Sequence, residues 1–206
     1  MHIENLLKKI LFTSIQMHFD SEEIAKMGNI VVITGSPRKE GNSFAMTEAF
    51  INAAKAQGHH VTRFDVANER MSGCHACKSC FKTDKACVYD DLFNQIAPAI
   101  LNADGVVLTM PVYWYSFPMQ IKGVIDKFYS FYIGGKDVSG KKCALIACCE
   151  EDNIAGFNGI LMPYRRTAAF LKWKCVGEVL VQNVLKVGDI YMTNGCARAA
   201  QLAKEF

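Results

Sequence analysis

The strongest constraint on the fold of this chain is a regular alternation of short apolar runs with longer stretches of helical periodicity. Strands are predicted at residues 29–34, 60–66, 105–110, 142–148 and 176–181. Helices are predicted at residues 43–57, 90–102, 119–132, 159–172 and 194–206. Strands that alternate with helices in this way pair in parallel, and their crossover helices cover both faces of the sheet. We therefore predict an α/β protein with a buried parallel sheet.

Composition supports one folded domain and excludes two classes of partner. Half of the 206 residues are hydrophobic and 21% are charged, which is typical of a globular protein. A net charge of +3 is too small for a dedicated nucleic-acid binder, which needs a basic stripe. The longest uncharged stretch, residues 105–121, contains two prolines and is shorter than the roughly 20 apolar residues of a membrane span. We expect neither nucleic acid nor a membrane as a partner.

Cysteine usage and the N-terminus predict the compartment. The apolar patch at residues 10–12 is short, follows two lysines and has no small-residue cleavage site after it, so no secretory signal is predicted. The nine cysteines are an odd number, and the chain is long enough to fold without disulfides. We expect a cytoplasmic protein, where clustered cysteines indicate metal or redox chemistry more than disulfides.

Residues 1–28 precede the alternating pattern and form a predicted N-terminal helical extension, followed by a domain at residues 29–206. Apolar side chains recur in the extension at helical spacing, at Ile3, Leu6, Leu7, Ile10 and Leu11. Two interpretations have equal weight. The extension is either a helix docked on its own subunit or an arm that grips a partner subunit.

The predicted sheet indicates where a ligand would bind. In a doubly wound parallel sheet the ligand lies beyond the carboxyl ends of the strands, where the strand order reverses. The loops that follow Thr34, Met110 and Cys148 are therefore the first places to search for a site.

The loop at residues 35–43, Gly-Ser-Pro-Arg-Lys-Glu-Gly-Asn-Ser, has the composition of an anion-binding turn. Asn42 and Ser43 open the next helix, where side chains and free backbone N–H groups can face an anion, and Arg38 adds a fork of donors. Gly41 is not followed by Lys-Ser/Thr, and the chain has no Gly-x-Gly-x-x-Gly, so neither common nucleotide fingerprint fits. The loop predicts a pocket for a dianionic phosphate, against the alternative of an ordinary capped turn.

The segment at residues 111–118, Pro-Val-Tyr-Trp-Tyr-Ser-Phe-Pro, directly follows the third predicted strand. Its aromatic residues are predicted to form a wall for a flat ring, with Ser116 and backbone groups at the polar edge of that ring. These aromatics are Tyr113, Trp114, Tyr115 and Phe117. The alternative is that they cover the sheet end or a dimer contact. Beside a phosphate loop, the wall indicates a nucleotide-like cofactor.

Three motifs together resemble the flavodoxin-like NAD(P)H-dependent FMN reductase family. They are Gly-Ser-Pro-Arg-x-x-Gly-Asn-Ser after the first strand, Pro-Val-Tyr-Trp at residues 111–114, and the helix at residues 120–128. The resemblance runs from about residue 29 to the last strand. It implies a flavodoxin-like doubly wound five-stranded parallel sheet in the order 2-1-3-4-5, with helices on both faces.

The resemblance also implies a set of FMN-binding residues. The FMN phosphate would be held by Ser36, Arg38, Asn42 and Ser43. The isoalloxazine would be lined by Pro111, Val112, Tyr113, Trp114 and Ser116. The pyrimidine edge would be approached by Cys148, Cys149 and Glu150, although this segment departs from the small polar residues expected there. The chemistry takes place at flavin N5, so no catalytic side chain is expected.

A second cluster, Cys74, Cys77, Cys80 and Cys87, has the spacing C-x2-C-x2-C-x6-C. Three cysteines at two-residue gaps can surround one face of a cubane cluster, a fourth can close it, and soft thiolates suit iron. The motif is similar to that of iron–sulfur flavoproteins, a branch of the same family that binds [4Fe-4S]. A tetrahedral zinc site with His75, a redox disulfide and four free thiols are open alternatives.

The other five cysteines are predicted to be small buried hydrophobic residues. They are Cys143, Cys148, Cys149, Cys175 and Cys196.

The resemblance implies an FMN-dependent enzyme that takes hydride from NAD(P)H and passes electrons to a quinone, a nitroaromatic or another acceptor. The alternative is an iron–sulfur flavoprotein electron carrier that exchanges electrons with ferredoxin. A third hypothesis is a zinc-stabilised binding module, which leaves the loop at residues 35–43 unexplained. A homodimer or tetramer is expected from the resemblance.

Overall fold

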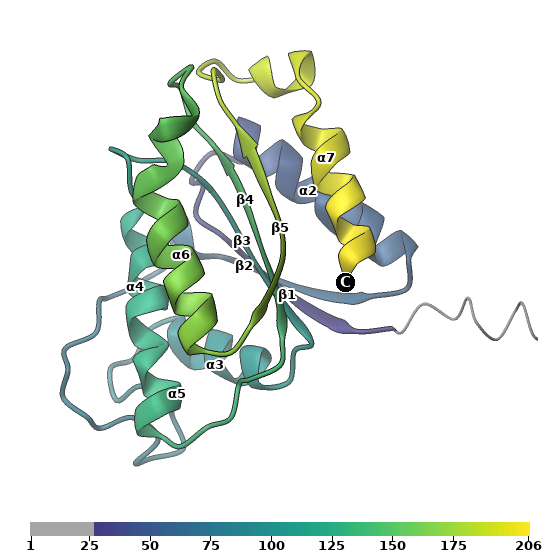
Figure 1. Cartoon of the computed structure of the whole chain (residues 1–206). Coiled ribbons are helices and arrows are strands. Elements are labelled where there is room, and N and C mark those ends of the chain that lie inside the picture. Colours follow the sequence, from purple (N-terminus) through teal and green to yellow (C-terminus); the bar gives the residue numbers. More distant parts are fainter. Residues whose placement is uncertain (1–26) are drawn as a thin grey trace, which may run out of the picture.

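The computed structural model describes residues 27–206, in which one sheet lies between two layers of helices (Figure 1). The strands are β1 (Asn29–Thr34), β2 (His60–Asp65), β3 (Gly105–Pro111), β4 (Lys142–Cys148) and β5 (Lys174–Val181). All neighbours pair in parallel, in the order β2-β1-β3-β4-β5, which confirms the predicted sheet. The predicted extension at residues 1–28 lies outside the described residues except for its last two.

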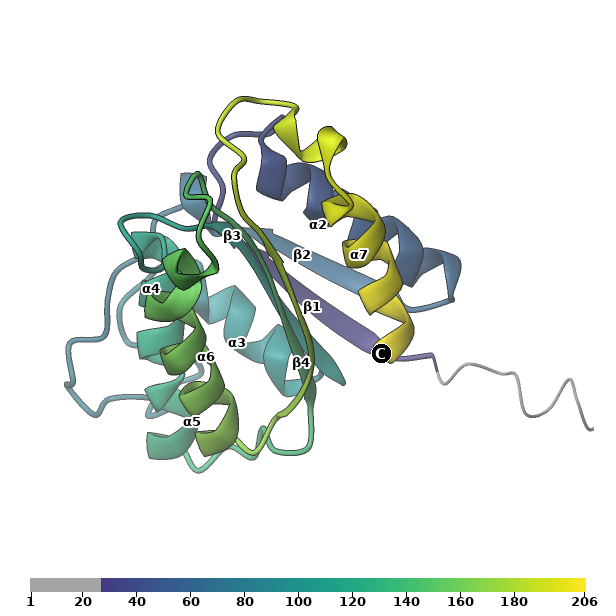
Figure 2. The same ribbon diagram turned by 45° about the horizontal axis from the view of Figure 1, so that its top comes forward.

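The helices divide between the two faces of the sheet (Figures 1 and 2). One face is covered by α2 (Asn42–Ala56) and α7 (Gly195–Leu202). The other is covered by α3 (Phe93–Leu101), α4 (Met119–Lys127), α5 (Tyr129–Ile133) and α6 (Asn158–Phe170). Short 3-10 turns complete the chain: η1 (Val66–Asn68), η2 (Ile154–Phe157), η3 (Asp189–Met192) and η4 (Ala203–Glu205).

Several predicted boundaries differ from the structure. The helix predicted at residues 119–132 is divided at Phe128 into α4 and α5. The helix that Asp90 and Asp91 were predicted to cap begins at Phe93. Its N-cap position is Leu92, and the Asp91 carboxylate accepts a hydrogen bond from the Phe93 N–H at 3.1 Å just before the helix. Pro98 lies inside α3.

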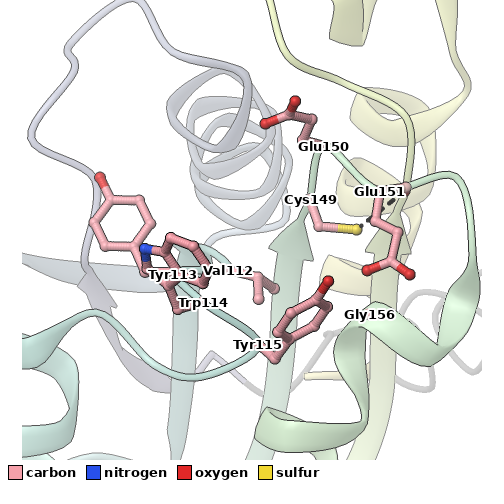
Figure 3. A pocket seen from close by; sticks show the side chains of 8 residues that line it. All are labelled: Val112, Tyr113, Trp114, Tyr115, Cys149, Glu150, Glu151 and Gly156. Atoms are coloured by element: carbon pink, nitrogen blue, oxygen red, sulfur yellow. Dashed lines mark hydrogen bonds between the residues drawn. The ribbon is translucent and has the colours of Figure 1, made fainter.

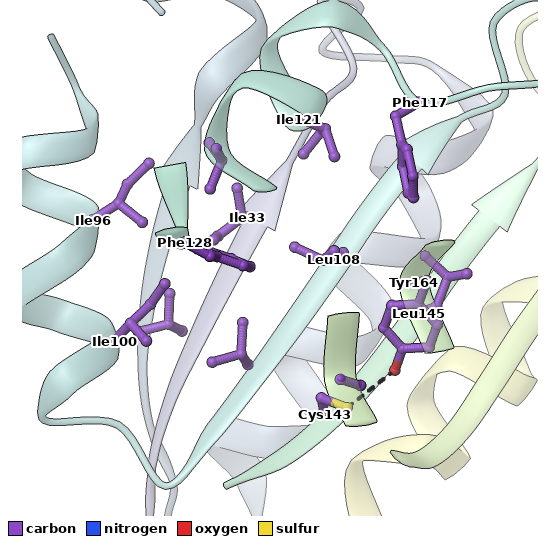
Figure 4. Packing of buried hydrophobic residues seen from close by; sticks show 14 of the residues in the cluster. Ile33, Ile96, Ile100, Leu108, Phe117, Ile121, Phe128, Cys143, Leu145 and Tyr164 are labelled. Atoms are coloured by element: carbon purple, nitrogen blue, oxygen red, sulfur yellow. Dashed lines mark hydrogen bonds between the residues drawn. The ribbon is translucent and has the colours of Figure 1, made fainter. Parts of the chain in front are cut away.

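The core is continuous across both faces of the strands, as expected for a buried parallel sheet. In β1, Val31 and Ile33 belong to the apolar cluster beneath α3, α4 and α6, while Ile30 and Val32 belong to the cluster beneath α2 and α7. Figure 4 shows the first cluster, in which side chains of three strands meet those of α3 and α4. Four successive residues of β1 are thus buried between the two helix layers. This packing holds the strand, and therefore the loop that follows its carboxyl end, in place in the sheet.

The chain leaves β1 and β3 toward opposite faces, because β1 continues into α2 and β3 into α4. These adjacent strands form the switch point at which a crevice opens in sheets of this kind. Among residues 27–206, no helix combines the length and the apolar character needed to cross a bilayer.

Candidate functional site

A crevice of two adjoining cavities lies at the carboxyl ends of β1, β3 and β4. The larger, of about 660 Å³, is lined by Val112, Tyr113, Trp114, Tyr115, Cys149, Glu150, Glu151 and Gly156 (Figure 3). The smaller, of about 220 Å³, is lined by Ser36, Arg38, Gly41, Asn42, Ser43, Pro111, Val112, Tyr113, Cys148, Cys149, Glu150, Val184, Leu185 and Val187. The three predicted loops therefore meet at one place, and four residues border both cavities.

The loop between β1 and α2 presents backbone donors to the smaller cavity. The first N–H groups of a helix have no partner within the helix, and among the described residues no side chain caps the start of α2. The first turn of α2 carries no acidic residue, so the positive end of the helix dipole is not offset there. Ser36 and Ser43 are buried, and the exposed Arg38 lies at the mouth. This end of the crevice is suited to an anion.

The side chain of Asn42 has a different role from the one predicted. Its amide donates to the Lys186 carbonyl at 2.9 Å and accepts from the Ile190 N–H at 3.2 Å. It thereby fastens the loop between β5 and η3 over the smaller cavity, and Val184, Leu185 and Val187 of this loop line that cavity. The contribution of Asn42 to an anion site is limited to its backbone N–H.

Sequence reasoning missed the three apolar loop residues at positions 184, 185 and 187. They carry no motif, and they lie more than 140 residues beyond the loop that they cover. Their only signal is the presence of apolar side chains after the last strand.

A two-residue hairpin presents the aromatic wall to the larger cavity. Tyr113 and Ser116 exchange backbone hydrogen bonds of 3.0 and 2.9 Å. Between them, Trp114 and Tyr115 have φ angles of 46° and 61°. This left-handed pair matches the turn that tight hairpins favour, where Asn-Gly is the usual sequence. Each such non-glycine residue costs about 1–3 kcal/mol, and strain of this kind concentrates at functional sites.

The aromatic residues of the predicted wall differ in exposure to solvent, because the chain turns at the hairpin. Trp114 is 94% exposed, whereas Phe117 is 6% exposed and packs in the core. Phe117 therefore does not belong to the wall, because the chain turns inward after the hairpin. Ser116 lines neither cavity. Tyr113, Trp114 and Tyr115 do line the larger cavity, and the tip of their hairpin rests against the first turn of α6 at Gly159.

The loop after β4 brings thiols and carboxylates to the crevice. Burial raises the pKa of the Cys148 thiol to about 12 and also raises the pKa of Cys149, so both thiols are protonated at neutral pH. The Cys149 thiol donates to the Glu151 carbonyl at 3.4 Å (Figure 3). Glu151 Oε2 is buried and has no hydrogen-bond partner within residues 27–206. With Glu150, it gives the larger cavity a negative character.

The four predicted cysteine ligands lie in a separate segment, residues 72–91, between η1 and α3. One small cavity of about 20 Å³ is bordered by all four, which are Cys74, Cys77, Cys80 and Cys87. His75, Lys127 and Ser130 also border this cavity. Across residues 27–206 no three His, Cys, Asp or Glu side chains are already grouped as metal ligands. The four thiols thus border one cavity, but they are not close enough together to ligate one metal ion as they stand.

The thiols of this segment are electrostatically coupled. A hydrogen bond from the Ser79 backbone lowers the pKa of the exposed Cys77. Burial raises the pKa of Cys80, and charges on the other three cysteines raise it further. Three residues of the segment, Ala76, Lys78 and Phe81, have φ angles of 53°, 56° and 53°. Alternation of left-handed with ordinary residues turns backbone N–H groups toward a common centre and favours anions.

A buried ion pair closes the two ends of this segment. The Asp91 carboxylate accepts hydrogen bonds from the Ser72 N–H and hydroxyl, both at 3.0 Å, and from the Lys127 ammonium. The Lys127 and Asp91 side chains are each 2% exposed. Although burial opposes it, hydrogen bonds from Lys127 and Ser72 lower the pKa of Asp91. The cysteine segment is therefore a loop with its ends fastened to α4.

The fold and the crevice define a doubly wound α/β protein with a crevice at the switch point of its sheet. The chain belongs to the family described as having a flavodoxin-like fold, whose model matches residues 28–203.

Comparison with individual proteins agrees with this assignment. An iron–sulfur flavoprotein of Methanosarcina thermophila is 35% identical over 98 residues, which are 48% of this chain and 51% of that protein. The chain spans about half the length of the curated relatives it matches first.

Solved structures resemble the fold at low identity. An azoreductase from Bacillus anthracis has a TM-score of 0.68 and 18% identity, covering 87% of this chain and 100% of that one. An NAD(P)H:quinone oxidoreductase from Methanothermobacter marburgensis has a TM-score of 0.64 and 14% identity, covering 86% and 95% of the two chains. At such identities the likeness concerns the fold alone.

Proposed function

We propose that this chain is an FMN-dependent oxidoreductase that takes hydride from NAD(P)H and passes electrons to a quinone, a nitroaromatic or another small acceptor. One observation carries the proposal. A single crevice at the switch point has at one end the first turn of α2, which no side chain of residues 27–206 caps, and at the other end a strained aromatic hairpin. An anion site beside a wall for a flat ring matches the two parts of a flavin mononucleotide.

The chemical groups that line the crevice and the volumes of its cavities fit FMN. The two cavities lie within or just below the range of about 300–1,000 Å³ that is typical of small-ligand sites. The backbone of Asn42 and Ser43, with the Arg38 guanidinium, would hold the phosphate. Glu151 Oε2, which has no hydrogen-bond partner among the residues that the structure describes, would be an acceptor for an N–H at the pyrimidine edge of the ring. Bound FMN supplies both hydride and single-electron chemistry.

Other residues would position the ring and shield the site. Val112 and Tyr113 border both cavities and would support the ring beside its phosphate-bearing chain. The exposed Trp114 offers a face on which a second aromatic molecule can stack. Glu150 and Glu151 would disfavour anionic acceptors near the larger cavity, since like charges repel. Neutral quinones and nitroaromatics are consistent with that field.

Titration with FMN and anaerobic reduction test the proposal. Saturable quenching of FMN fluorescence by the full chain, followed by bleaching of the visible flavin bands with NADH or NADPH, is the expected result. Added quinone should then restore the bands. Failure to bind FMN contradicts the cofactor, whereas FMN that binds but stays oxidised with both pyridine nucleotides contradicts the reductase.

We propose a second candidate, an iron–sulfur flavoprotein carrier that exchanges electrons with ferredoxin. It is supported by the four thiols that border one cavity and by the curated relatives, which are named as iron–sulfur flavoproteins. The Ser130 hydroxyl also borders this cavity, is buried, and lacks a partner within the described chain. A hydroxyl in this position could donate to a cluster sulfur, and the Lys127 ammonium would offset negative charge there.

The donor set fits a cluster in chemical kind, because soft thiolates select iron–sulfur centres. Cys74, Cys77, Cys80 and Cys87 would hold it, and the segment would have to open beyond its present cavity of about 20 Å³. A bound cluster supplies single-electron transfer. Anaerobic purification with iron and acid-labile sulfide analysis tests this candidate. Four irons with matching sulfide and reduction by ferredoxin support it, while zinc without sulfide contradicts it.

The assembly and location expected from the resemblance are part of the same proposal. We propose that residues 29–206 form the flavin domain, that residues 1–28 form an N-terminal helical extension, and that the cytoplasmic protein is a homodimer or tetramer. Light scattering of the full chain after size-exclusion chromatography measures the assembly. A monomeric mass at micromolar concentration contradicts it.

A further inference from the structure

Two thiols lie together at the end of the sheet opposite the candidate crevice. Cys143 is near the start of β4 and Cys175 is near the start of β5, and the strand register pairs them directly. Their Sγ atoms are 3.4 Å apart. Both were predicted to be buried hydrophobic residues, but Cys175 is exposed and only Cys143 is buried. Sequence alone did not pair them, because they are 32 residues apart.

The backbone geometry suits a disulfide between them. Neighbouring strands lie about 4.8 Å apart, and disulfides join residues whose Cα atoms are about 4.4–6.8 Å apart. A register shift between Cys143 and Ala144 marks a local irregularity of the ladder at this place.

The two sulfurs have unequal environments. The exposed Cys175 is accessible to small molecules. Burial raises the pKa of Cys143 to about 12, which keeps this sulfur protonated at rest. The Tyr164 hydroxyl donates to Cys143 Sγ at 3.3 Å (Figure 4), and such a donor stabilises the anionic sulfur during attack.

We propose that Cys175 and Cys143 form a dithiol–disulfide couple that exchanges with small disulfides, with Cys175 as the attacking residue and Cys143 as the resolving residue. The Cys175 thiolate attacks a small disulfide RSSR, forms a mixed disulfide and releases RS⁻. The Cys143 sulfur then attacks the Cys175 sulfur, and a second RS⁻ leaves. The two cysteine protons pass to the leaving groups, so RSSR gains two electrons and becomes two RSH.

This site does not depend on the crevice or on a flavin, since it lies at the amino ends of β4 and β5. It also differs from the cysteine segment at residues 72–91, whose thiols border a different cavity. The couple would cross-link β4, an inner strand, to β5, an edge strand of the sheet.

Peptide mapping of the full chain tests the proposal. Reduced protein is freed of reductant, exposed to oxidised glutathione, blocked with N-ethylmaleimide and digested with trypsin. The expected product links peptide 143–165 to peptide 175–186. Its mass is two hydrogens below the sum of the two peptides with Cys143 and Cys175 reduced and with the same N-ethylmaleimide adducts on Cys148 and Cys149. Fragment ions must place the bond at Cys143, because peptide 143–165 also contains Cys148 and Cys149.

Three variants sharpen the result. Cys175→Ser, at an exposed position, should abolish the linked product. Cys143→Ala should trap glutathione on Cys175, with at least about tenfold more mixed disulfide than in the unmodified chain, because the neighbouring thiol otherwise has a high effective concentration. Cys196→Ser removes a half-buried thiol on α7 and should change nothing. Absence of the linked product in the unmodified chain, or equal mixed disulfide with and without Cys143, overturns the proposal.

Discussion

The carbonyl oxygen of Tyr115 lies so close to the Cα of Gly159 that a β-carbon at residue 159 would come within 1.8 Å of it. The atom that would be struck is backbone, so a rotamer change cannot relieve the contact. The tip of the aromatic hairpin can therefore lie this close to α6 only because residue 159 has no side chain. The two consecutive left-handed residues of the hairpin, Trp114 and Tyr115, lie at this contact.

Gly159→Ala is expected to displace the hairpin and weaken FMN binding. Losing an aromatic contact of about 1–1.5 kcal/mol corresponds to roughly tenfold weaker binding, which fluorescence titration measures. The matched control is Gly73→Ala, since a β-carbon there meets nothing within 4 Å. Equal affinity in the two variants would show that the hairpin does not contact the cofactor.

Arg38→Glu tests the anion end of the crevice. Replacing a charge-assisted donor by a carboxylate should cost at least about 1.5–3 kcal/mol of FMN affinity, or roughly 10–100-fold. The control Lys39→Glu makes the same charge change at an exposed neighbour that lines neither cavity. If both variants lose affinity equally, the effect is a general one of net charge, and Arg38 is not a phosphate ligand.

Asp91→Asn tests the closure of the cysteine segment. The variant leaves the buried Lys127 ammonium without its carboxylate, and breaking one side of a buried ion pair typically costs about 3–5 kcal/mol. Urea unfolding measures this loss of stability, and faster reaction of Cys74 and Cys77 with a thiol reagent should accompany it. Asp90→Asn is the control, because the Lys85–Asp90 pair is at the surface and worth at most about 1 kcal/mol.

The lowered pKa of Asp91 also predicts a dependence of stability on acid. A carboxyl group whose pKa is depressed by folding adds stability that is complete above its unfolded pKa. That contribution is lost as the pH falls below the ordinary value of 3.8 toward the folded pKa. In the unmodified chain, the free energy of unfolding should therefore decrease as the pH is lowered below about pH 4. The slope should be shallower in Asp91→Asn, and parallel curves would refute a role for this carboxyl.

Much of the fold could be predicted from the sequence because its signals are local. The apolar runs that became β1, β3 and β4 are continuous, as buried parallel strands require. The turn residues at positions 35–43 mark the strand-to-helix connection. Because ligands of doubly wound sheets bind beyond the carboxyl ends of the strands, this loop was correctly expected at the crevice. Helix ends were less well predicted, because helix termini fray and a break such as the one at Phe128 carries no local signal.

Long-range contacts decided the rest. Asn42 was predicted to face an anion, yet its amide binds the loop at residues 186–190, and Phe117 was placed in the wall but fills the core. The Lys127–Asp91 pair and the Cys143–Cys175 pair each join residues more than 30 positions apart.

What the sequence by itself determined is the order and type of the elements, since hydrophobic periodicity is a property of neighbouring residues. Which side chains meet across the sheet was decided only by the tertiary structure, because parallel crossovers bring together residues that share no local pattern.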